Sequence, residues 1–146
     1  LIQDLLNSGA DVTAIDVSEE MINITRNKFP KIKTEIANVN KLPFKDSSFD
    51  FVVASFLIVH LKDLTSAFDE VYRVLKDGGE FLLTNINQRK APKLELKNGN
   101  TIVIQSYYHR PEDVIKALEH SFFKIKKEEF IREGKIWINQ IIKVVK

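Results

Sequence analysis

Apolar residues recur along this chain with two different periods, one typical of strands and one typical of helices. Phe49 to Leu57 is apolar at nearly every position, as expected for a strand covered on both faces in the middle of a parallel sheet. Residues 64–75 repeat apolar side chains at three- and four-residue spacing and predict an amphipathic helix. We expect Gly78-Gly79 to end that helix, and Phe81 to Ile86 to form the next strand.

The first forty residues predict the end of a helix, a strand, a second helix and a second strand. Residues 1–8 read as a helix tail, and residues 11–16 as a short strand that ends in an aspartate. Ser18 is a good N-cap for a helix that Pro30 stops, and residues 32–37 alternate as a strand near a sheet edge. Strands and helices that alternate through short links predict a doubly wound α/β sheet.

The last third of the chain has a different pattern. Asn98-Gly99 predicts a hairpin turn, and Pro111 is expected in the first turn of a helix. Two strands, Phe123 to Phe130 and Ile136 to Val145, are joined by a short glycine-containing link and should be antiparallel. Because there is no internal repeat or linker, we expect residues 1–146 to form a single domain.

Composition excludes several classes of protein. The 146 residues contain no cysteine, which rules out disulfides, thiolate metal sites and a cysteine nucleophile. The three histidines are scattered, so we expect no metal site, and a net charge of +2 indicates no nucleic-acid partner. No apolar run approaches the ~20 residues of a membrane helix. These features predict a cytoplasmic protein without a membrane partner, and they leave the oligomeric state open.

Three short motifs in a fixed order carry a family resemblance. Leu42-Pro43-Phe44 is followed by Ser48-Phe49-Asp50 and then by residues 74–79, Val-Leu-Lys-Asp-Gly-Gly. This order resembles the second half of the class I S-adenosylmethionine-dependent methyltransferases of small-molecule type. The resemblance implies a Rossmann-like sheet with a terminal antiparallel hairpin, S-adenosyl-L-methionine as the cofactor, and a transferase acting on a small molecule. A nicotinamide dehydrogenase ranks below it, because that class does not explain the motifs or the antiparallel strands.

Asp16 is the first candidate cofactor residue. It ends the strand of residues 11–16, which corresponds to the second strand of the family's fold. A carboxylate at the carboxyl end of that strand can accept hydrogen bonds from both ribose hydroxyls of an adenosine. The alternative is an aspartate that only helps to cap the following helix. The surrounding pattern favours ribose binding, and the resemblance implies that Val17 and Met21 line the adenine.

Asn38 and Val39 follow the next strand, where the family usually has aspartate in place of asparagine. That aspartate accepts a hydrogen bond from the adenine amine, while the next backbone N–H donates to the ring. An asparagine carbonyl can still accept the first bond, but without charge the contact should be weaker. The alternative is a turn asparagine that bonds its own backbone, and we favour the adenine contact over it.

Three further groups of the cofactor and substrate site follow from the resemblance. The backbone at Ser55 and Phe56 should face the methionine end of the cofactor. His60 lies near the acceptor, where a neutral imidazole could remove a proton, although packing or helix capping is the favoured role. Tyr107 and Tyr108 lie where relatives have substrate-facing insertions, and could equally be core residues at a strand end.

The glycine-rich loop of the family, an acidic residue followed by three spaced glycines, does not appear in these 146 residues. The sequence therefore predicts an N-terminally incomplete methyltransferase domain that lacks its first strand, with at least ~15 upstream residues missing. Such a chain should be poorly stable alone and bind the cofactor weakly or not at all, because two apolar strands would lose their shared neighbour. A non-catalytic binding or regulatory domain with the methyltransferase fold is the alternative function.

Overall fold

The structure is a computed structural model that describes residues 1–96 and 98–146. These residues form two compact units, Leu1–Pro43 and Phe44–Lys146. The first unit contains, in order, α1 (Ile2–Asn7), β1 (Thr13–Asp16), α2 (Glu19–Lys28) and β2 (Lys33–Ile36). The second contains β3 (Phe49–Ala54), the 3-10 helix η1 (Ile58–His60), α3 (Thr65–Val74), β4 (Leu75–Ile86), β5 (Lys93–Glu95), β6 (Thr101–Val103), α4 (Pro111–His120), β7 (Lys124–Glu133) and β8 (Ile136–Val145).

The first unit is a parallel pair of short strands with a helix between them in sequence. β1 and β2 run parallel, and Asp16 at the end of β1 lies opposite Ile36 at the end of β2. The Ser18 hydroxyl accepts a hydrogen bond from the Met21 N–H and caps α2, as the sequence predicts. Ile22 is the one buried residue of α2.

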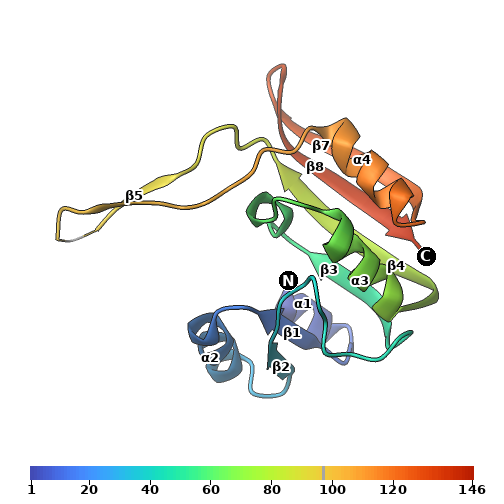
Figure 1. Cartoon of the computed structure of the whole chain (residues 1–146). Helices are drawn as coiled ribbons and strands as arrows, with labels where there is room; N and C mark the ends of the chain where they lie inside the picture. The colour runs from blue at the N-terminus through green and yellow to red at the C-terminus, as the bar shows by residue number, and fades with distance from the viewer. Residues whose placement is uncertain (97) are drawn as a thin grey trace. The chain divides into compact units, whose positions relative to one another are not determined.

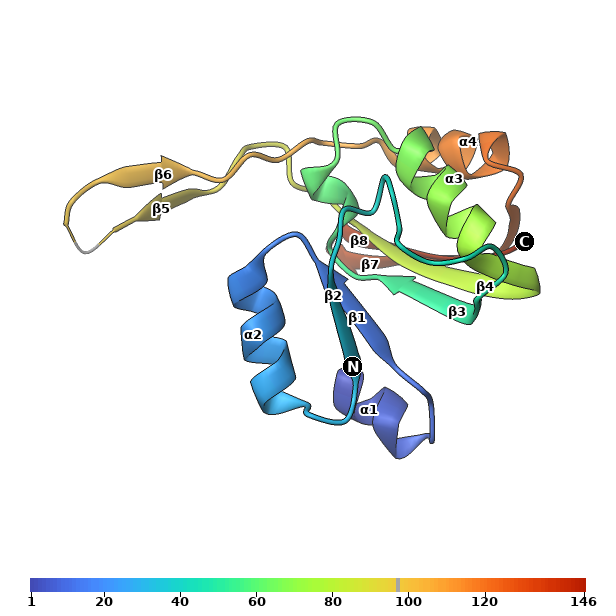
Figure 2. The ribbon, with the colours of Figure 1, turned by 60° about the horizontal axis from the view of Figure 1, so that its bottom comes forward.

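The second unit is built on a four-stranded mixed sheet with the order β3-β4-β8-β7. β3 and β4 are parallel, while β4 with β8 and β8 with β7 are antiparallel, as expected for the terminal hairpin. Helices α3 and α4 lie on one face of this sheet (Figure 2). The short strands β5 and β6 form a separate hairpin that extends away from the sheet (Figure 1). None of the helices in the described ranges has the length and apolar character that crossing a bilayer requires.

The core of the second unit lies between its sheet and its two helices. Phe68 of α3 packs edge-on against Phe81 of β4, with ring centroids 5.9 Å apart, and Phe81 also contacts Phe123. Leu118 of α4 is fully buried on the same side. The expected helical pattern of residues 64–75 is confirmed, because its apolar positions are the buried ones: Leu64, Phe68, Val71 and Leu75.

A pair of buried amides crosses this sheet. Asn85 of β4 and Gln140 of β8 are 1% and 0% exposed, and the Asn85 Nδ2 donates to the Gln140 Oε1 at 2.9 Å. Asn85 Nδ2 also donates to the His109 carbonyl, and Gln140 Nε2 donates to the Pro111 carbonyl and to a Glu128 carboxylate oxygen. The two side chains therefore fix the backbone that leads into α4.

One expectation about the central strands is met and one is wrong. In residues 1–96 and 98–146, β3 pairs with β4 alone and lies at the end of the strand order, and its Phe51 is 40% exposed. This agrees with the expectation that the apolar strand lacks a neighbour in this chain. The expectation that Gly78-Gly79 ends the helix is wrong, because the helix ends at Val74 and β4 begins at Leu75.

The glycine pair has a different role, within β4. Gly78 has a φ of +75°, which bends the strand. A Cβ added to Gly79 would lie 2.8 Å from the Lys76 carbonyl oxygen and 3.2 Å from the Asp50 carbonyl oxygen. The second glycine thus allows β3 and β4 to approach each other closely.

A strained residue follows β3. Phe56 has a φ of +56°, in the left-handed region that residues with a Cβ rarely adopt, and its side chain is exposed. Its N–H donates to the Thr84 Oγ1 of β4 at 2.8 Å. This hydrogen bond turns the backbone sharply at the carboxyl end of the parallel strand pair, and non-glycine residues are held in such conformations mainly at functional sites.

We expect Asn85→Ala to lower the free energy of unfolding of the second unit by about 2–3 kcal/mol, because it leaves buried acceptors without their donor. Urea unfolding followed by the fluorescence of Trp137, the only tryptophan, measures it. Gln105→Ala, at an exposed amide in the same unit, is the control and should cost less than about 0.5 kcal/mol. Equal losses for the two variants would contradict the role of the buried pair.

We expect Phe56→Gly to be more stable than Phe56→Ala by about 1 kcal/mol, because glycine adopts the left-handed conformation without a Cβ clash. The same two substitutions at Ser55, whose φ is not positive, should give the opposite order. Urea midpoints of the four variants test the prediction. An alanine variant at Phe56 that is as stable as the glycine variant would show that the backbone there is unstrained.

Candidate functional site

Asp16 lies at the carboxyl end of β1 with its side chain held in place. Its Oδ1 accepts a hydrogen bond from the Ser18 N–H at 2.9 Å, and the residue is half-buried. This bond orients the carboxylate at the start of α2, near the positive end of the helix dipole. An ionised carboxylate has about four acceptor sites, so one bond from the backbone leaves it able to accept from further hydroxyl groups.

Asn38 is brought next to Asp16 by the pairing of the strands. The Ala37 N–H donates to the Asp16 carbonyl at 3.0 Å, which places the residue after β2 beside the end of β1. The Asn38 Oδ1 accepts from the Asn40 N–H at 2.9 Å, and a backbone bridge to Lys41 closes the turn. The structure thus contains the turn that the sequence allows as an alternative role, and this turn exposes the Asn38 side chain at the same strand edge as Asp16.

Large apolar side chains are exposed around these two polar residues. Val17 and Met21, both expected at the site, are 69% and 48% exposed, and Val39 is half-buried in the turn after β2. Ile36, which the sequence does not single out, is 53% exposed and lies opposite Asp16. The signal that could have found Ile36 is its position at the end of β2, level with the candidate carboxylate.

The first unit therefore has a carboxylate acceptor, an amide and exposed aliphatic side chains near the carboxyl ends of β1 and β2. An adenosine needs these same groups: acceptors for two ribose hydroxyls, a polar partner for the adenine amine, and apolar surface for the ring faces. The donor and acceptor types present fit this ligand.

In the second unit, Ser55 and Phe56 form the sharp turn at the end of β3. Ser55 is exposed, and the bond from Phe56 to Thr84 fixes the backbone between them. η1 follows directly, so His60 lies within a short, ordered segment after the strand.

His60 and Tyr107 are brought together by the segment that returns from the β5–β6 hairpin. The His60 Nδ1 lies 3.3 Å from the Gln105 carbonyl oxygen, and the Tyr107 N–H donates to the Val59 carbonyl at 2.7 Å. The His60 ring is exposed and donates to a backbone acceptor in this arrangement. This contact with the Gln105 carbonyl joins the loop after β3 to the segment that follows β6.

His109 holds the same loop from the other side, and sequence reasoning does not assign it a role. Its Nε2 lies 3.0 Å from the Ile58 carbonyl oxygen and 2.9 Å from the Leu61 carbonyl oxygen. Both neighbours are acceptors, so this nitrogen carries the proton and donates to both. The contact joins residues 48 and 51 positions apart, which no local pattern in the sequence could indicate.

Tyr108 faces a different environment from Tyr107. Its ring lies 6.4 Å from that of Trp137, and the Arg89 guanidinium lies 5.1 Å from its centre. The Tyr107 hydroxyl instead accepts from the Gln105 Nε2 at 2.6 Å, so the hydrogen bonds and ring contacts of the two tyrosine side chains are with different residues.

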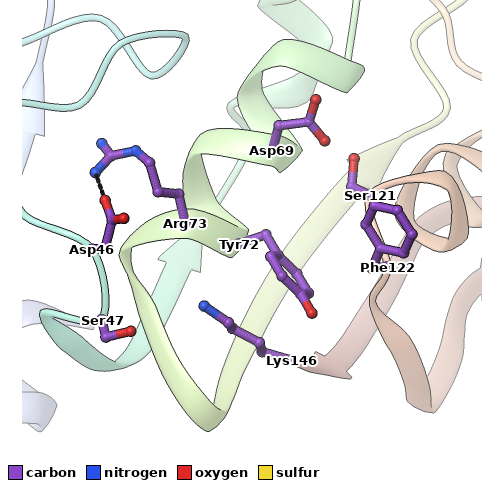
Figure 3. Close-up of a pocket in the computed structure, with 8 residues that line it drawn as sticks. All are labelled: Asp46, Ser47, Asp69, Tyr72, Arg73, Ser121, Phe122 and Lys146. Carbon is purple, nitrogen blue, oxygen red and sulfur yellow. Dashed lines mark hydrogen bonds and ion pairs between the residues drawn. The ribbon is translucent and has the colours of Figure 1, made fainter.

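A pocket of about 460 Å³ in the second unit contains none of the predicted site residues (Figure 3). Arg73 on its wall donates to Asp46, Glu70 and the Phe44 carbonyl, each at 2.8 Å. Hydrogen bonds to Glu70 and then Asp46 raise the pKa of the Arg73 guanidinium above its usual range. Because its charges already tie α3 to the turn before β3, we assign this pocket a structural role.

Comparison with known proteins gives a family. The model of the family described as "Methyltransferase domain" matches residues 1–83. A demethylmenaquinone methyltransferase of Chlorobaculum parvum is 44% identical over 71 residues, 49% of this chain and 30% of that protein. The ubiquinone/menaquinone biosynthesis C-methyltransferase UbiE of Rickettsia prowazekii is 40% identical over 81 residues, 51% of this chain and 33% of that protein. The match thus spans about a third of the length of these curated relatives.

Solved structures share the fold. An S-adenosylmethionine-dependent methyltransferase from Methanosarcina mazei has a TM-score of 0.81 at 21% identity, covering 100% of this chain and 86% of that one. The 1,6-didemethyltoxoflavin-N1-methyltransferase of Burkholderia thailandensis, solved with S-adenosylhomocysteine, has a TM-score of 0.69 at 14% identity, covering 99% of this chain and 65% of that one. The expected α/β methyltransferase fold is confirmed. The chain belongs to the methyltransferase-domain family.

Proposed function

We propose that this chain is part of an enzyme that transfers a methyl group from S-adenosyl-L-methionine to a small-molecule acceptor. The observation that carries the proposal is the placement of Asp16 and Asn38 at the ends of two paired strands, beside exposed apolar side chains. Membership of the methyltransferase-domain family supports it. The names of the two relatives, both methyltransferases of quinone biosynthesis, support a small-molecule acceptor.

We propose that the first unit binds the adenosine part of the cofactor. The Asp16 carboxylate, oriented by the Ser18 N–H, would accept from the ribose hydroxyls. The Asn38 amide and the Val39 N–H would contact the adenine edge, while Val17 and Met21 would cover its faces. S-adenosyl-L-methionine, when bound, supplies a methyl group activated by a sulfonium.

In the second unit, the proposed role of Ser55 and Phe56 is to offer backbone groups to the methionine part. The Thr84 hydroxyl holds the Phe56 N–H, so the backbone conformation is set before any ligand binds. His60 and His109 order the segment that follows, His60 through Gln105 and His109 through Ile58 and Leu61. Alignment of the reacting groups would then supply most of the rate enhancement, with no general base required.

Asp16→Ala should weaken the binding of S-adenosylhomocysteine by about 10- to 100-fold, because two hydrogen bonds to a charged acceptor are lost. Calorimetric titration of the ligand into the chain measures this change. Asp11→Ala, at an exposed aspartate in the same unit that pairs with Lys33, is the matched control and should leave the affinity unchanged. If Asp16→Ala bound the ligand as tightly as the parent, or if Asp11→Ala lost as much affinity as Asp16→Ala, the proposed site would be wrong.

Asn38→Asp should strengthen the binding of S-adenosylhomocysteine by about two- to tenfold, because an ionised oxygen accepts the adenine amine more strongly than an amide carbonyl does. An aspartate can form the same turn with the Asn40 N–H, so the local fold should be kept. Asn40→Asp, two residues later, adds the same charge as a control. Weaker binding by Asn38→Asp than by its control would argue against the adenine contact.

A further inference from the structure

A pocket of about 600 Å³ lies at the start of α4 and the turn between β7 and β8. Tyr108, Phe130 and Trp137 supply its aromatic side chains, and Arg89, Arg110 and Arg132 its positive charges. Pro111 and Glu112 complete the lining. This combination of rings and guanidinium groups is not used by the proposed methyl transfer.

The three aromatic rings form one continuous cluster. Trp137 lies 6.4 Å from Tyr108 with an angle of 33° between the rings, and 6.3 Å from Phe130 with an angle of 77°. All three are half-buried, so each keeps some surface open. A planar ligand could stack on this cluster, because aromatic rings favour offset and edge-on neighbours.

Two of the three arginines lie against the rings, and of their N–H groups the Arg89 Nε donates to the Asn87 Oδ1 at 3.4 Å. The Arg89 guanidinium lies 5.1 Å from the centre of Tyr108, and that of Arg132 lies 5.1 Å from the centre of Phe130. In the part of the chain that the structure describes, none of the three pocket arginines forms an ion pair with a carboxylate. A stacked guanidinium can still direct its N–H groups to a carboxylate in a bidentate manner.

The pocket rests on parts of the fold that are fixed by hydrogen bonds. The Trp137 carbonyl accepts from the Asn87 Nδ2 at 2.7 Å, and the Asn87 N–H donates to the Ile138 carbonyl. The Pro111 carbonyl accepts from the buried Gln140. Preorganised walls of this kind reduce the entropy lost when a ligand binds.

We propose that this pocket is a binding site for a small aromatic carboxylate, whose ring stacks on Trp137 and Tyr108 and whose carboxylate accepts from the arginines. Three cations against one anion, Glu112, favour a negatively charged ligand. The flat aromatic walls favour a planar one. The site lies past the carboxyl end of β4, and its occupation does not depend on the proposed methyl transfer.

Trp137 provides a direct reporter, because it is the only tryptophan and its indole N–H gives a single NMR signal. We expect benzoate, titrated into the ¹⁵N-labelled chain, to move this signal in a saturable manner. Benzamide, which has the same shape without the charge, should bind at least about tenfold more weakly, since charge-assisted hydrogen bonds are roughly twice as strong as neutral ones. Inorganic phosphate should move the signal less than benzoate does, because it cannot stack.

Arg132→Gln and Arg89→Gln should each weaken benzoate binding by about fivefold or more. Lys124→Gln, which removes one positive charge from the far end of the same strand as Arg132, should leave it unchanged. Having two arginine variants keeps the test valid if one of them fails to fold. Equal binding of benzoate and benzamide, an equal response to phosphate, or an equal loss in Lys124→Gln would overturn the proposal.

Discussion

The buried hydrogen bond between Asn85 and Gln140 is the interaction on which the loop after β3 and the start of α4 depend. It crosses from β4 to β8 in the interior of the sheet, where an unpaired amide would be costly. From this pair, hydrogen bonds reach the carbonyls of His109 and Pro111. The His109 ring then donates to two carbonyls of the loop after β3. One polar pair in the core thus determines the position of a loop and of the first turn of α4.

In the first unit, hydrogen bonds to nearby backbone N–H groups hold the candidate side chains in place. The Asp16 carboxylate is oriented by an N–H only two residues later, and the neighbouring turn is held by Asn38 in the same way. Each of these bonds joins residues two positions apart, and both side chains keep part of their surface open to solvent. The apolar side chains exposed beside them, Val17 and Ile36 among them, are surfaces that a bound ring could cover.

Elements with a strong local pattern could be predicted from the sequence. The amphipathic helix of residues 64–75, the Ser18 cap, the Asn98-Gly99 hairpin and the terminal antiparallel strands are all confirmed. The role of the glycine pair was predicted wrongly, because it depends on the neighbouring strand and not on local sequence. His109 and the Asn85–Gln140 pair could not be found, since polar residues joined over about 50 positions leave no periodic signal.

We propose that the paired strand ends of the first unit bind adenosine. A crystal structure of the protein with S-adenosylhomocysteine would show whether they do. We expect both ribose hydroxyls on the Asp16 carboxylate and the adenine edge at Asn38 and Val39. An ordered ligand bound elsewhere, with only solvent on Asp16, would contradict it.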